Sequence, residues 1–307
     1  MCRGKGFESS KGFGRTVALS ALLMTCQAPV FADEQLFGHI KGAEPMPRGA
    51  MEVVGYATHR WDKGAGSYAA TDYKLEVERG LTDRLTGALY LKGMGIDTSG
   101  LRIDGYMPAD EKYAFKLSGV EASLKYAFLT PAKDDIGIAA YLSFSRDWID
   151  AHSGQDKDKY NLELKLLAQK YFLDGQVVWA ANTGIGSTYA KRGAVTLPYP
   201  DFEWTTDPEM EIEYMVGTGL SYRFAPNWYI GAEVFYETEF ETEVGQERWS
   251  VQAGPSLHYG ARDWWFTLSW LPQISGGGEK FAAQNDQNLH LIEKTKQEVR
   301  LKVGFNF

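Results

Sequence analysis

Cysteine is nearly absent from this chain. Its only two cysteines among 307 residues are Cys2 and Cys26, and both stand close to the start. We expect the segment that contains them to be removed, so the mature chain would have neither a disulfide framework nor a thiolate metal site. The alternative is a lipoprotein acylated at Cys26, which Thr25 disfavours as the preceding residue.

Long apolar runs are missing as well. The apolar run at 17–24 is too short to cross a bilayer as a helix, which takes about 20 residues. Four basic residues precede this run: Arg3, Lys5, Lys11 and Arg15. Val30 and Ala32 suit the −3 and −1 positions of a signal-peptidase site. We therefore predict a cleaved signal peptide over 1–32 and a mature chain that begins at Asp33.

The chain also lacks an excess of positive charge. The whole chain has a formal net charge of −8, and the predicted signal peptide carries four basic residues and Glu8. Its removal takes away a net +3 and changes the formal charge from −8 to −11. Surfaces that bind nucleic acid are basic because they neutralise phosphates, so the composition argues against a nucleic-acid partner.

What the chain does have is alternation of apolar and polar residues. Near its end, Val299, Leu301 and Val303 fall on one face of an extended strand, while Glu298 and Arg300 fall on the other. From Met51 onward we predict about twelve such strands, at 51–61, 68–79, 85–94, 115–128, 136–146, 160–171, 176–189, 210–224, 228–240, 247–260, 264–274 and 297–307. No helical pattern separates them, so each pair reads as a hairpin.

The connections between these strands alternate between short turns, such as 82–84, and long polar loops, such as 191–208. An even strand number with this asymmetry is typical of a transmembrane antiparallel up-and-down β-barrel, because lipid cannot satisfy an open sheet edge. We therefore predict an all-β fold, with a periplasmic N-terminal segment at 33–49 and an outer-membrane barrel at 50–307. A secreted β-sandwich is the alternative. Aromatic residues near the short turns are expected to form a girdle at the lipid headgroups: Tyr126, Phe128, Tyr222, Phe224, Trp228, Tyr259 and Trp264.

Two details disturb the strand pattern. Pro255 stands inside the tenth predicted strand, where it removes a backbone donor and requires a bulge or an edge. The fourth strand changes phase near Ser118 and Gly119, which also predicts a bulge.

Charged side chains recur on the face that we assign to the lumen. They are Glu52, Arg60, Lys74, Glu76, Glu121, Lys125, Glu163, Lys165, Glu211, Glu213, Arg223, Glu233, Arg248, Glu298, Arg300 and Lys302. Acidic and basic members nearly cancel. One interpretation is a network of ion pairs that fills a narrow barrel, and the other is a small aqueous pore lined by charge. Twelve strands leave both open, because eight give a filled interior and sixteen give a channel.

Catalytic and metal-binding patterns are weak. Ser256 and His258 share a strand face two residues apart, as a nucleophile and base could, but nothing supplies a third orienting group. Glu209, Glu211 and Glu213 make one strand end acidic, which suits either a solvated loop or a calcium site. We expect no resident metal, no cofactor and no enzymatic activity.

The chain ends on Phe307, preceded by Val303 and Phe305 at alternate positions. This end resembles the C-terminal strand of bacterial outer-membrane β-barrels, which finishes on Phe. The resemblance implies that these residues form an assembly signal, read by the outer-membrane barrel assembly machinery. It further implies periplasmic chaperones, lipid and lipopolysaccharide as partners, and location in the outer membrane of a Gram-negative bacterium.

The first quarter of the mature chain carries a series of short motifs. They are Leu36-Phe37-Gly38, Lys41-Gly42-Ala43-Glu44, Pro47-Arg48-Gly49, Arg60-Trp61-Asp62-Lys63-Gly64, Gly66-Ser67-Tyr68 and Gly80-Leu81-Thr82-Asp83-Arg84. This series resembles a family of uncharacterised, porin-like outer-membrane β-barrel proteins from Gram-negative bacteria. That family brings no known activity with it. The leading hypothesis is a narrow passive channel for small solutes or ions. The alternatives are a plugged barrel with a structural or surface-interaction role and an outer-membrane hydrolase.

Overall fold

The structure, a computed structural model, describes residues 35–196, 202, 204–241 and 245–307. The predicted signal peptide and the alternative acylation site at Cys26 lie outside these residues. The strands are β1 (Met51–Trp61), β2 (Ser67–Gly80), β3 (Leu85–Ser99), β4 (Lys112–Leu129), β5 (Gly137–Ile149), β6 (Asp156–Phe172), β7 (Val177–Arg192), β8 (Glu209–Ala225), β9 (Trp228–Glu241), β10 (Gly245–Gly260), β11 (Trp264–Trp270), β12 (Gln273–Gly278) and β13 (Gln297–Asn306).

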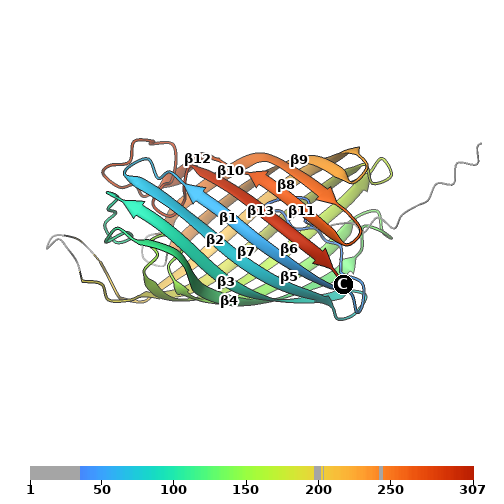
Figure 1. Cartoon of the computed structure of the whole chain (residues 1–307), viewed down its shortest axis with the longest axis horizontal. Helices are drawn as coiled ribbons and strands as arrows, with labels where there is room; N and C mark the ends of the chain where they lie inside the picture. The colour runs from blue at the N-terminus through green and yellow to red at the C-terminus, as the bar shows by residue number, and fades with distance from the viewer. Residues whose placement is uncertain (1–34, 197–201, 203, 242–244) are drawn as a thin grey trace, which may run out of the picture. The chain divides into compact units, whose positions relative to one another are not determined.

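These strands form a closed antiparallel barrel (Figure 1). Each strand from β1 to β10 pairs with the next along the chain, β11 pairs with β13, and β13 pairs with β1, so the sheet returns on itself. Both β11 and β12 pair with β10, and they are two halves of one wall strand interrupted at Leu271 and Pro272. The described residues therefore give twelve strand positions around the wall, which confirms the predicted fold class. Within the same residues, no helix is long and apolar enough to cross a membrane.

The alternation of the sequence becomes the two faces of the wall. In β6, Leu162, Leu164 and Leu166 point outward with about half of their surface exposed. Glu163 and Lys165 between them point inward and form an ion pair at 2.9 Å. Large exposed apolar side chains recur in this way on the outer face of the barrel. A wall that is apolar outside and charged inside is stable when lipid surrounds it and water or polar groups fill it.

The two irregular positions have physical explanations. Between β3 and β4 the register shifts, with Lys92 opposite Gly119 and Gly93 opposite Leu117, so Ser118 is the extra residue of the predicted bulge. Pro255 is in regular register with Ala232 on β9. Its other side faces the interruption between β11 and β12, where the ladder is already broken, so no bulge at Pro255 is needed.

The barrel has a short-turn end and a long-loop end. The short turns include 81–84, 226–227 and 261–263, and the long loops include 100–111 and 279–296. Near the short turns, the rings of Trp228 and Tyr259 pack in a tilted arrangement with centroids 4.9 Å apart, and the Tyr259 ring lies 5.3 Å from that of Trp264. The predicted aromatic residues are thus gathered at this end, as a headgroup girdle requires.

Candidate functional site in the barrel lumen

The inner wall carries all sixteen charged residues that the sequence assigns to it. Most are buried or half-buried, and their outward neighbours along each strand are more exposed. Several form ion pairs across or along the strands, such as Lys74 with Glu121 at 2.9 Å. The three residues of the predicted assembly signal lie instead on the outer face, beside the short-turn end: Val303, Phe305 and Phe307. Phe307 is 72% exposed.

Residues 35–46, which we call the luminal segment, fold into the lumen as an irregular loop. At its two ends, Gln35 contacts Thr267 and Met46 contacts Thr86, both close to the short-turn end. At its tip, His39 Nε2 lies 2.8 Å from Glu298 Oε1, farther up the wall. The sequence predicts these residues as an irregular periplasmic segment. They are irregular and are anchored near the short-turn end, and they lie inside the barrel, where the inner wall supplies partners for their backbone.

Glu233 on β9 is the main acceptor for this segment. Its carboxylate accepts hydrogen bonds from the backbone amides of Gly38, His39 and Ile40, at 2.5, 2.8 and 3.1 Å. The facing wall supplies donors for the backbone carbonyls. Arg300 donates to Gly38 at 3.0 Å, and Lys302 donates to Phe37 at 2.7 Å. Glu233 is 3% exposed, so its charge is compensated by these amides in a site shielded from water.

Amide side chains hold the descending half of the segment. Asn182 on β7 accepts from the backbone nitrogen of Lys41 at 2.7 Å and donates to its carbonyl at 2.8 Å. Gln169 on β6 accepts from the backbone nitrogen of Ala43 at 2.8 Å. These side chains take the place of a neighbouring strand, because they form hydrogen bonds with backbone groups of the luminal segment that no strand pairs with.

Two apolar side chains of the segment pack where the wall has no side chain. Phe37 and Ile40 are 1% and 0% exposed. A Cβ added to Gly219 would lie 2.7 Å from the Phe37 ring, and one added to Gly217 would lie 2.6 Å from Ile40 Cδ1. Both distances are too short for a side chain to fit, so these two glycines form a notch that admits the segment.

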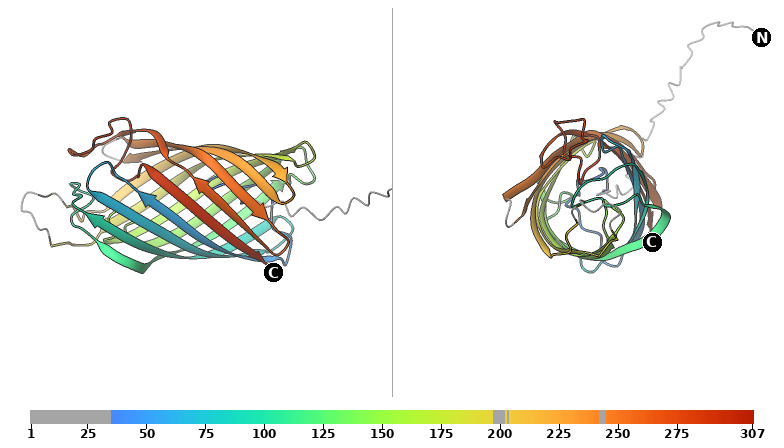
Figure 2. Two further views of the ribbon diagram at one scale, coloured as in Figure 1. Left: turned by 45° about the horizontal axis from the view of Figure 1, so that its top comes forward. Right: turned by 90° about the vertical axis from the view of Figure 1, so that its left-hand side faces the viewer.

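Loops close the long-loop end. Loops 100–111, 150–155 and 279–296 turn inward, so that chain segments are visible inside the ring of strands in the view along the barrel (Figure 2). The Lys63 ammonium, 1% exposed, donates to the carbonyls of Leu291, Ile292 and Lys294 at 3.3, 2.5 and 3.0 Å. An apolar cluster fills the space between these loops and the wall: Tyr68, Ala70, Met94, Ile96, Leu101, Ile103, Met107, Ile149 and Ile292.

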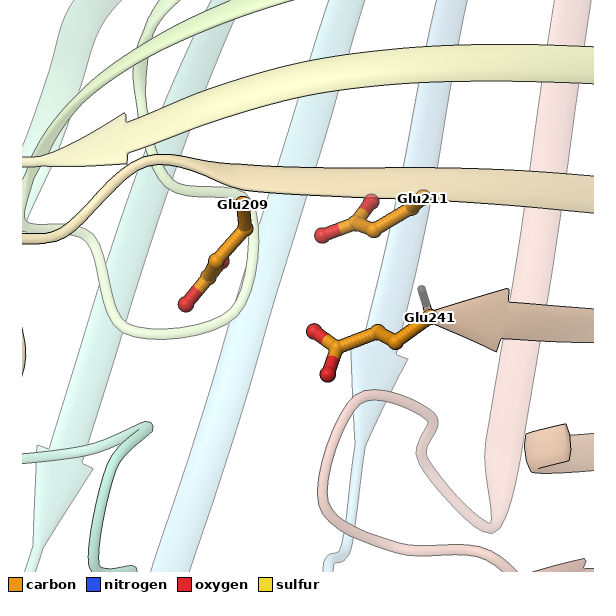
Figure 3. A group of neighbouring side chains, drawn as sticks. All are labelled: Glu209, Glu211 and Glu241. Carbon is orange, nitrogen blue, oxygen red and sulfur yellow. The ribbon is translucent and has the colours of Figure 1, made fainter. Parts of the chain in front are cut away.

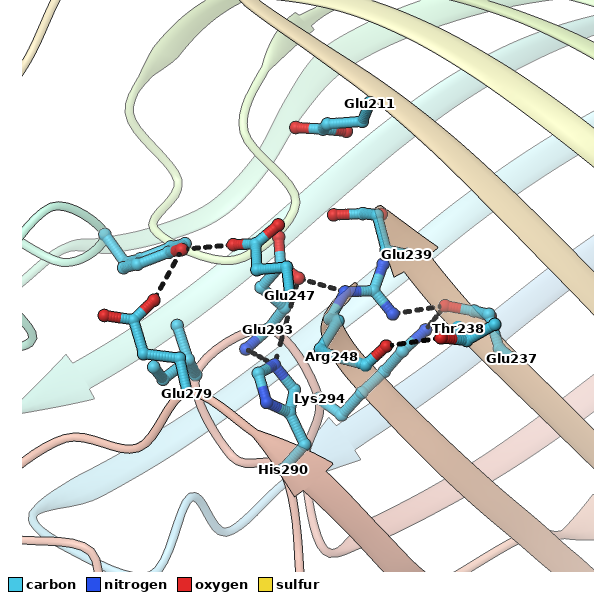
Figure 4. Close-up of polar contacts among 12 residues, drawn as sticks. Glu211, Glu237, Thr238, Glu239, Glu247, Arg248, Glu279, His290, Glu293 and Lys294 are labelled. Carbon is cyan, nitrogen blue, oxygen red and sulfur yellow. Dashed lines mark hydrogen bonds and ion pairs between the residues drawn. The ribbon is translucent and has the colours of Figure 1, made fainter. Parts of the chain in front are cut away.

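A charged network below this closure is centred on Arg248 (Figure 4). Its guanidinium contacts Glu237 at 2.7 Å, Glu239 at 2.5 Å and Glu293 of the loop. Lys294 also pairs with Glu237. Because Glu239, Glu247 and Glu293 bring three carboxylates together, this group could hold a cation, but Arg248 already supplies positive charge there. The network ties loop 279–296 to the wall.

Two of the three residues of the predicted acidic strand end, Glu209 and Glu211 on β8, lie beside Glu241 at the end of β9 (Figure 3), with one carboxylate oxygen of each within 4.8 Å of the others. The third predicted residue, Glu213, lies beside Glu237 instead. Arg192 pairs with Glu209, and Lys159 lies 3.9 Å from Glu211. Two of the three carboxylates therefore have a protein cation beside them.

A pocket of about 220 Å³, partly open to solvent, lies between the luminal segment and the loops of the long-loop end. Its floor is His39, its roof includes His152 and Glu293, and its walls include Arg60 and Arg300. Arg60 donates two hydrogen bonds to Asp72, at 2.6 and 3.0 Å. We call this cavity the chamber. Lower down, beside Lys41, Tyr90 and Lys125, only about 10 Å³ is left open, so the luminal segment fills that part of the barrel.

Ser256 and His258 do point into the lumen, but the structure does not join them as a nucleophile and base. His258 Nδ1 lies 2.7 Å from the Thr267 hydroxyl, and the ring packs near Tyr229 and Trp265. Thr267 in turn donates to the backbone carbonyl of Gln35. His258 therefore helps to support the luminal segment.

The sequence interpretation did not identify the luminal segment or its partners. A signal was present, because Leu36, Phe37 and Ile40 are apolar within a segment otherwise read as irregular and exposed. The inward amides of Asn182 and Gln169 were also informative, since uncharged amides on a luminal face suit backbone partners.

Comparisons with known proteins agree with this architecture. The structure is similar to an outer-membrane channel, COG4313, from Pseudomonas putida F1, with a TM-score of 0.57 and 12% identity over 86% of this chain and 98% of that one. The translocator domain of the autotransporter NalP from Neisseria meningitidis gives 0.48 and 12%, over 85% and 90%. The KdgM porin with disordered oligogalacturonate gives 0.42 and 12%, over 84% and 99%.

At 12% identity, the similarity to the Pseudomonas putida channel shows the fold alone, that of an outer-membrane β-barrel. No curated protein matches the chain. Residues 29–307 match the model of a family of unknown function, DUF6662. This match spans the N-terminal motifs and the whole barrel, so the chain belongs to the DUF6662 family, whose function is unknown.

Proposed function

We propose that this protein is a narrow passive channel for small solutes or ions across the outer membrane, and that the structure is its closed state. The chamber is the observation that carries the proposal. A barrel that served only as a filled support would have no reason to keep about 220 Å³ of charged, unfilled space between two closures. On the usual share of liquid volume, such a space would hold on the order of seven waters.

The closures favour a channel for a second reason. Both consist of loops or a terminal segment, and the wall itself does not collapse inward. With the luminal segment removed, the lower lumen would expose Glu233, Asn182, Gln169, Arg300 and Lys302. These groups interact well with water, so the vacated space would hydrate and conduct.

The orientation follows from the loops. We assign the short-turn end to the periplasm and the long-loop end to the cell exterior, as in barrels whose long loops are extracellular. The C-terminal residues Val303, Phe305 and Phe307 would serve as the signal for the assembly machinery. Periplasmic chaperones, lipid and lipopolysaccharide are the partners that this route implies.

Liposome swelling tests the proposal. Purified protein is reconstituted and challenged with small neutral, anionic and cationic solutes of increasing size. We expect slow entry of the smallest solutes and a sharp upper size limit, because the chamber is small. Absence of entry in the parent protein and in variants with a displaced luminal segment would reject the channel. It would favour the second candidate, a plugged barrel with a structural role, which the Arg248 network supports by fixing loop 279–296 to the wall.

A further inference from the structure

The lower half of the lumen is built as a binding site for an extended peptide, and its occupant is the chain's own N-terminal segment. We propose that residues 35–46 are a detachable plug, which leaves and re-enters the barrel through the short-turn end. This inference concerns how passage of solutes through the barrel is regulated, and its biological meaning rests on the proposed function. The docking equilibrium itself can be measured whether or not the barrel conducts.

The topology of the segment permits withdrawal. Gln35 and Met46 both contact the wall near the short-turn end, while the tip at His39 reaches upward to Glu298. The segment is therefore a loop inserted from one mouth, not a strand threaded through the barrel. It can leave as a unit without passing any chain end through the lumen.

The chemistry of the site permits withdrawal too. The segment is held by side chains and contributes no strand to the sheet. Glu233, Asn182 and Arg300 are hydrophilic, and water can replace the segment as their partner at small net cost, since a hydrogen bond in a protein is worth little beyond the one to water that it replaces. Undocking does expose apolar surface, because Leu36, Phe37 and Ile40 pack in one buried cluster with four wall residues: Val178, Ala180, Met215 and Phe235. This cost keeps the docked form predominant, so the plug leaves the lumen only part of the time.

The closure at the long-loop end is held by more groups. Its apolar cluster includes nine buried residues contributed by the wall and by several loops, against seven in the cluster that holds the luminal segment. The buried ammonium of Lys63 also binds three carbonyls of loop 279–296 at once. Opening that end would expose this apolar surface and leave a buried charge without its partners, which costs more. The lower plug is therefore the closure that moves.

Cysteine labelling in the full-length protein tests the proposal. Cys2 and Cys26 are replaced by Ser, and Ala43→Cys is introduced as the single reporter. Ala43 is 0% exposed and packs with Ala127, Ala139 and Leu167, so a thiol there is protected while the segment is docked. A membrane-impermeant maleimide then measures how often the segment is out of the lumen.

Glu233→Gln removes the carboxylate that accepts three amides and substitutes a donor for one acceptor. We expect labelling about ten- to a hundredfold faster than in the parent, the factor that corresponds to the loss of one or two charge-assisted hydrogen bonds. Glu163→Gln is the matched control, because Glu163 also lies on the inner wall but pairs with Lys165 instead of the segment. It should label at the parent rate. Equal rates in all three proteins would overturn the proposal.

A second pair of variants guards against misfolding at Glu233. Gly219→Val fills the notch under Phe37, and Gly55→Val adds the same atoms on the outer face, where a Cβ would have open space. Folding of each variant is checked by heat-modifiable gel mobility. Fast labelling in Gly219→Val alone supports the plug, and equal labelling in both overturns it. Fast labelling without solute entry would reject the channel and support the plug. Solute entry with equal labelling in the two variants would support the channel and reject the plug.

Discussion

Lys41 and Asn182 exchange two hydrogen bonds across the lumen, although 141 positions separate them in the chain. The amide of Asn182 satisfies the nitrogen and the carbonyl of Lys41 together, as a neighbouring strand would. This relationship shows how the barrel recognises a backbone instead of a particular side chain. It also allows the donor and the acceptor to be tested separately.

Asn182→Asp keeps the acceptor for the Lys41 amide and removes the donor to its carbonyl. Asn182→Leu removes both. We expect maleimide labelling of the Ala43→Cys reporter to rise by about tenfold in Asn182→Leu, since each neutral hydrogen bond contributes about 1 kcal/mol. It should rise at least as much in Asn182→Asp, because a buried carboxylate oxygen then faces the Lys41 carbonyl oxygen. Labelling at the parent rate in both variants would contradict the role of this contact.

Glu44 makes docking sensitive to pH. It lies in the luminal segment close to Lys133, and burial raises the pKa of its carboxyl from 4.5 to about 7. Its Oε2 has no hydrogen-bond partner among the residues that the structure describes. A raised pKa means that the docked form binds the proton more tightly. The carboxyl therefore favours docking most below pH 4.5, and this contribution is lost as the pH rises through about 7.

We expect the labelling rate due to undocking to be roughly tenfold higher at pH 8 than at pH 5. This ratio is smaller than a fully buried carboxyl would give, because the Glu44 side chain is partly exposed. Glu44→Gln should remove this dependence. Each labelling rate is divided by that of the same protein unfolded in urea at the same pH, which corrects for the reactivity of the thiol beside residue 44. Identical pH profiles would show that Glu44 does not control docking.

Arg248 stabilises the charged network under the long-loop closure. Arg248→Met leaves Glu239 and Glu293 facing each other without their shared cation, so we expect the free energy of unfolding to fall by about 3–5 kcal/mol. Arg146→Met is the control, because the pair of Arg146 with Asp158 is about half exposed and should contribute about 0–1 kcal/mol. Urea unfolding in detergent or lipid measures both. Equal effects would contradict the assigned role of the network.

Much of the wall follows from the sequence because alternation with a period of two is a local signal. It predicts β1, β8 and β9 to within a residue or two of their observed ends. It fails at the far end of β3, where Gly93 and Gly95 interrupt the pattern and the Phe115 ring of β4 lies over Gly93. It also predicts a single strand at 264–274, whereas the structure has β11, an interruption at Leu271 and Pro272, and β12 as far as Gly278. Loop 288–296 takes the place of β13 beside β12, and a local pattern cannot show this.

The charged inner face can be predicted from the sequence in the same way, since each residue on it alternates with a lipid-facing one. The segments that fill the barrel cannot be predicted from this alternation. The contact of Gly38 with Glu233 joins residues 195 positions apart and uses the glycine backbone, so no side-chain pattern marks it. The closed lumen is a property of long-range backbone contacts, and only the folded arrangement shows it.

Phe307 is predicted to act in assembly more than in stability. It is 72% exposed on the outer face, so Phe307→Ala removes little packing from the barrel. We expect a several-fold fall in the amount of folded protein in the outer membrane, with an unchanged urea midpoint for the molecules that do fold. Phe128→Ala, at an exposed aromatic near the same end, serves as the control and should leave the amount unchanged.

Single-channel recording with a reversible lock tests the central claim most directly. An ideal Cβ on Gly38 lies 3.0 Å from Ser269 Oγ, so the pair Gly38→Cys and Ser269→Cys can form a disulfide between plug and wall. In a planar bilayer, the reduced protein should show a closed baseline with discrete brief openings, and oxidation should abolish them until reductant is added. Openings that persist unchanged in the oxidised protein would contradict gating by the luminal segment, and a reduced protein that never opens would contradict the channel.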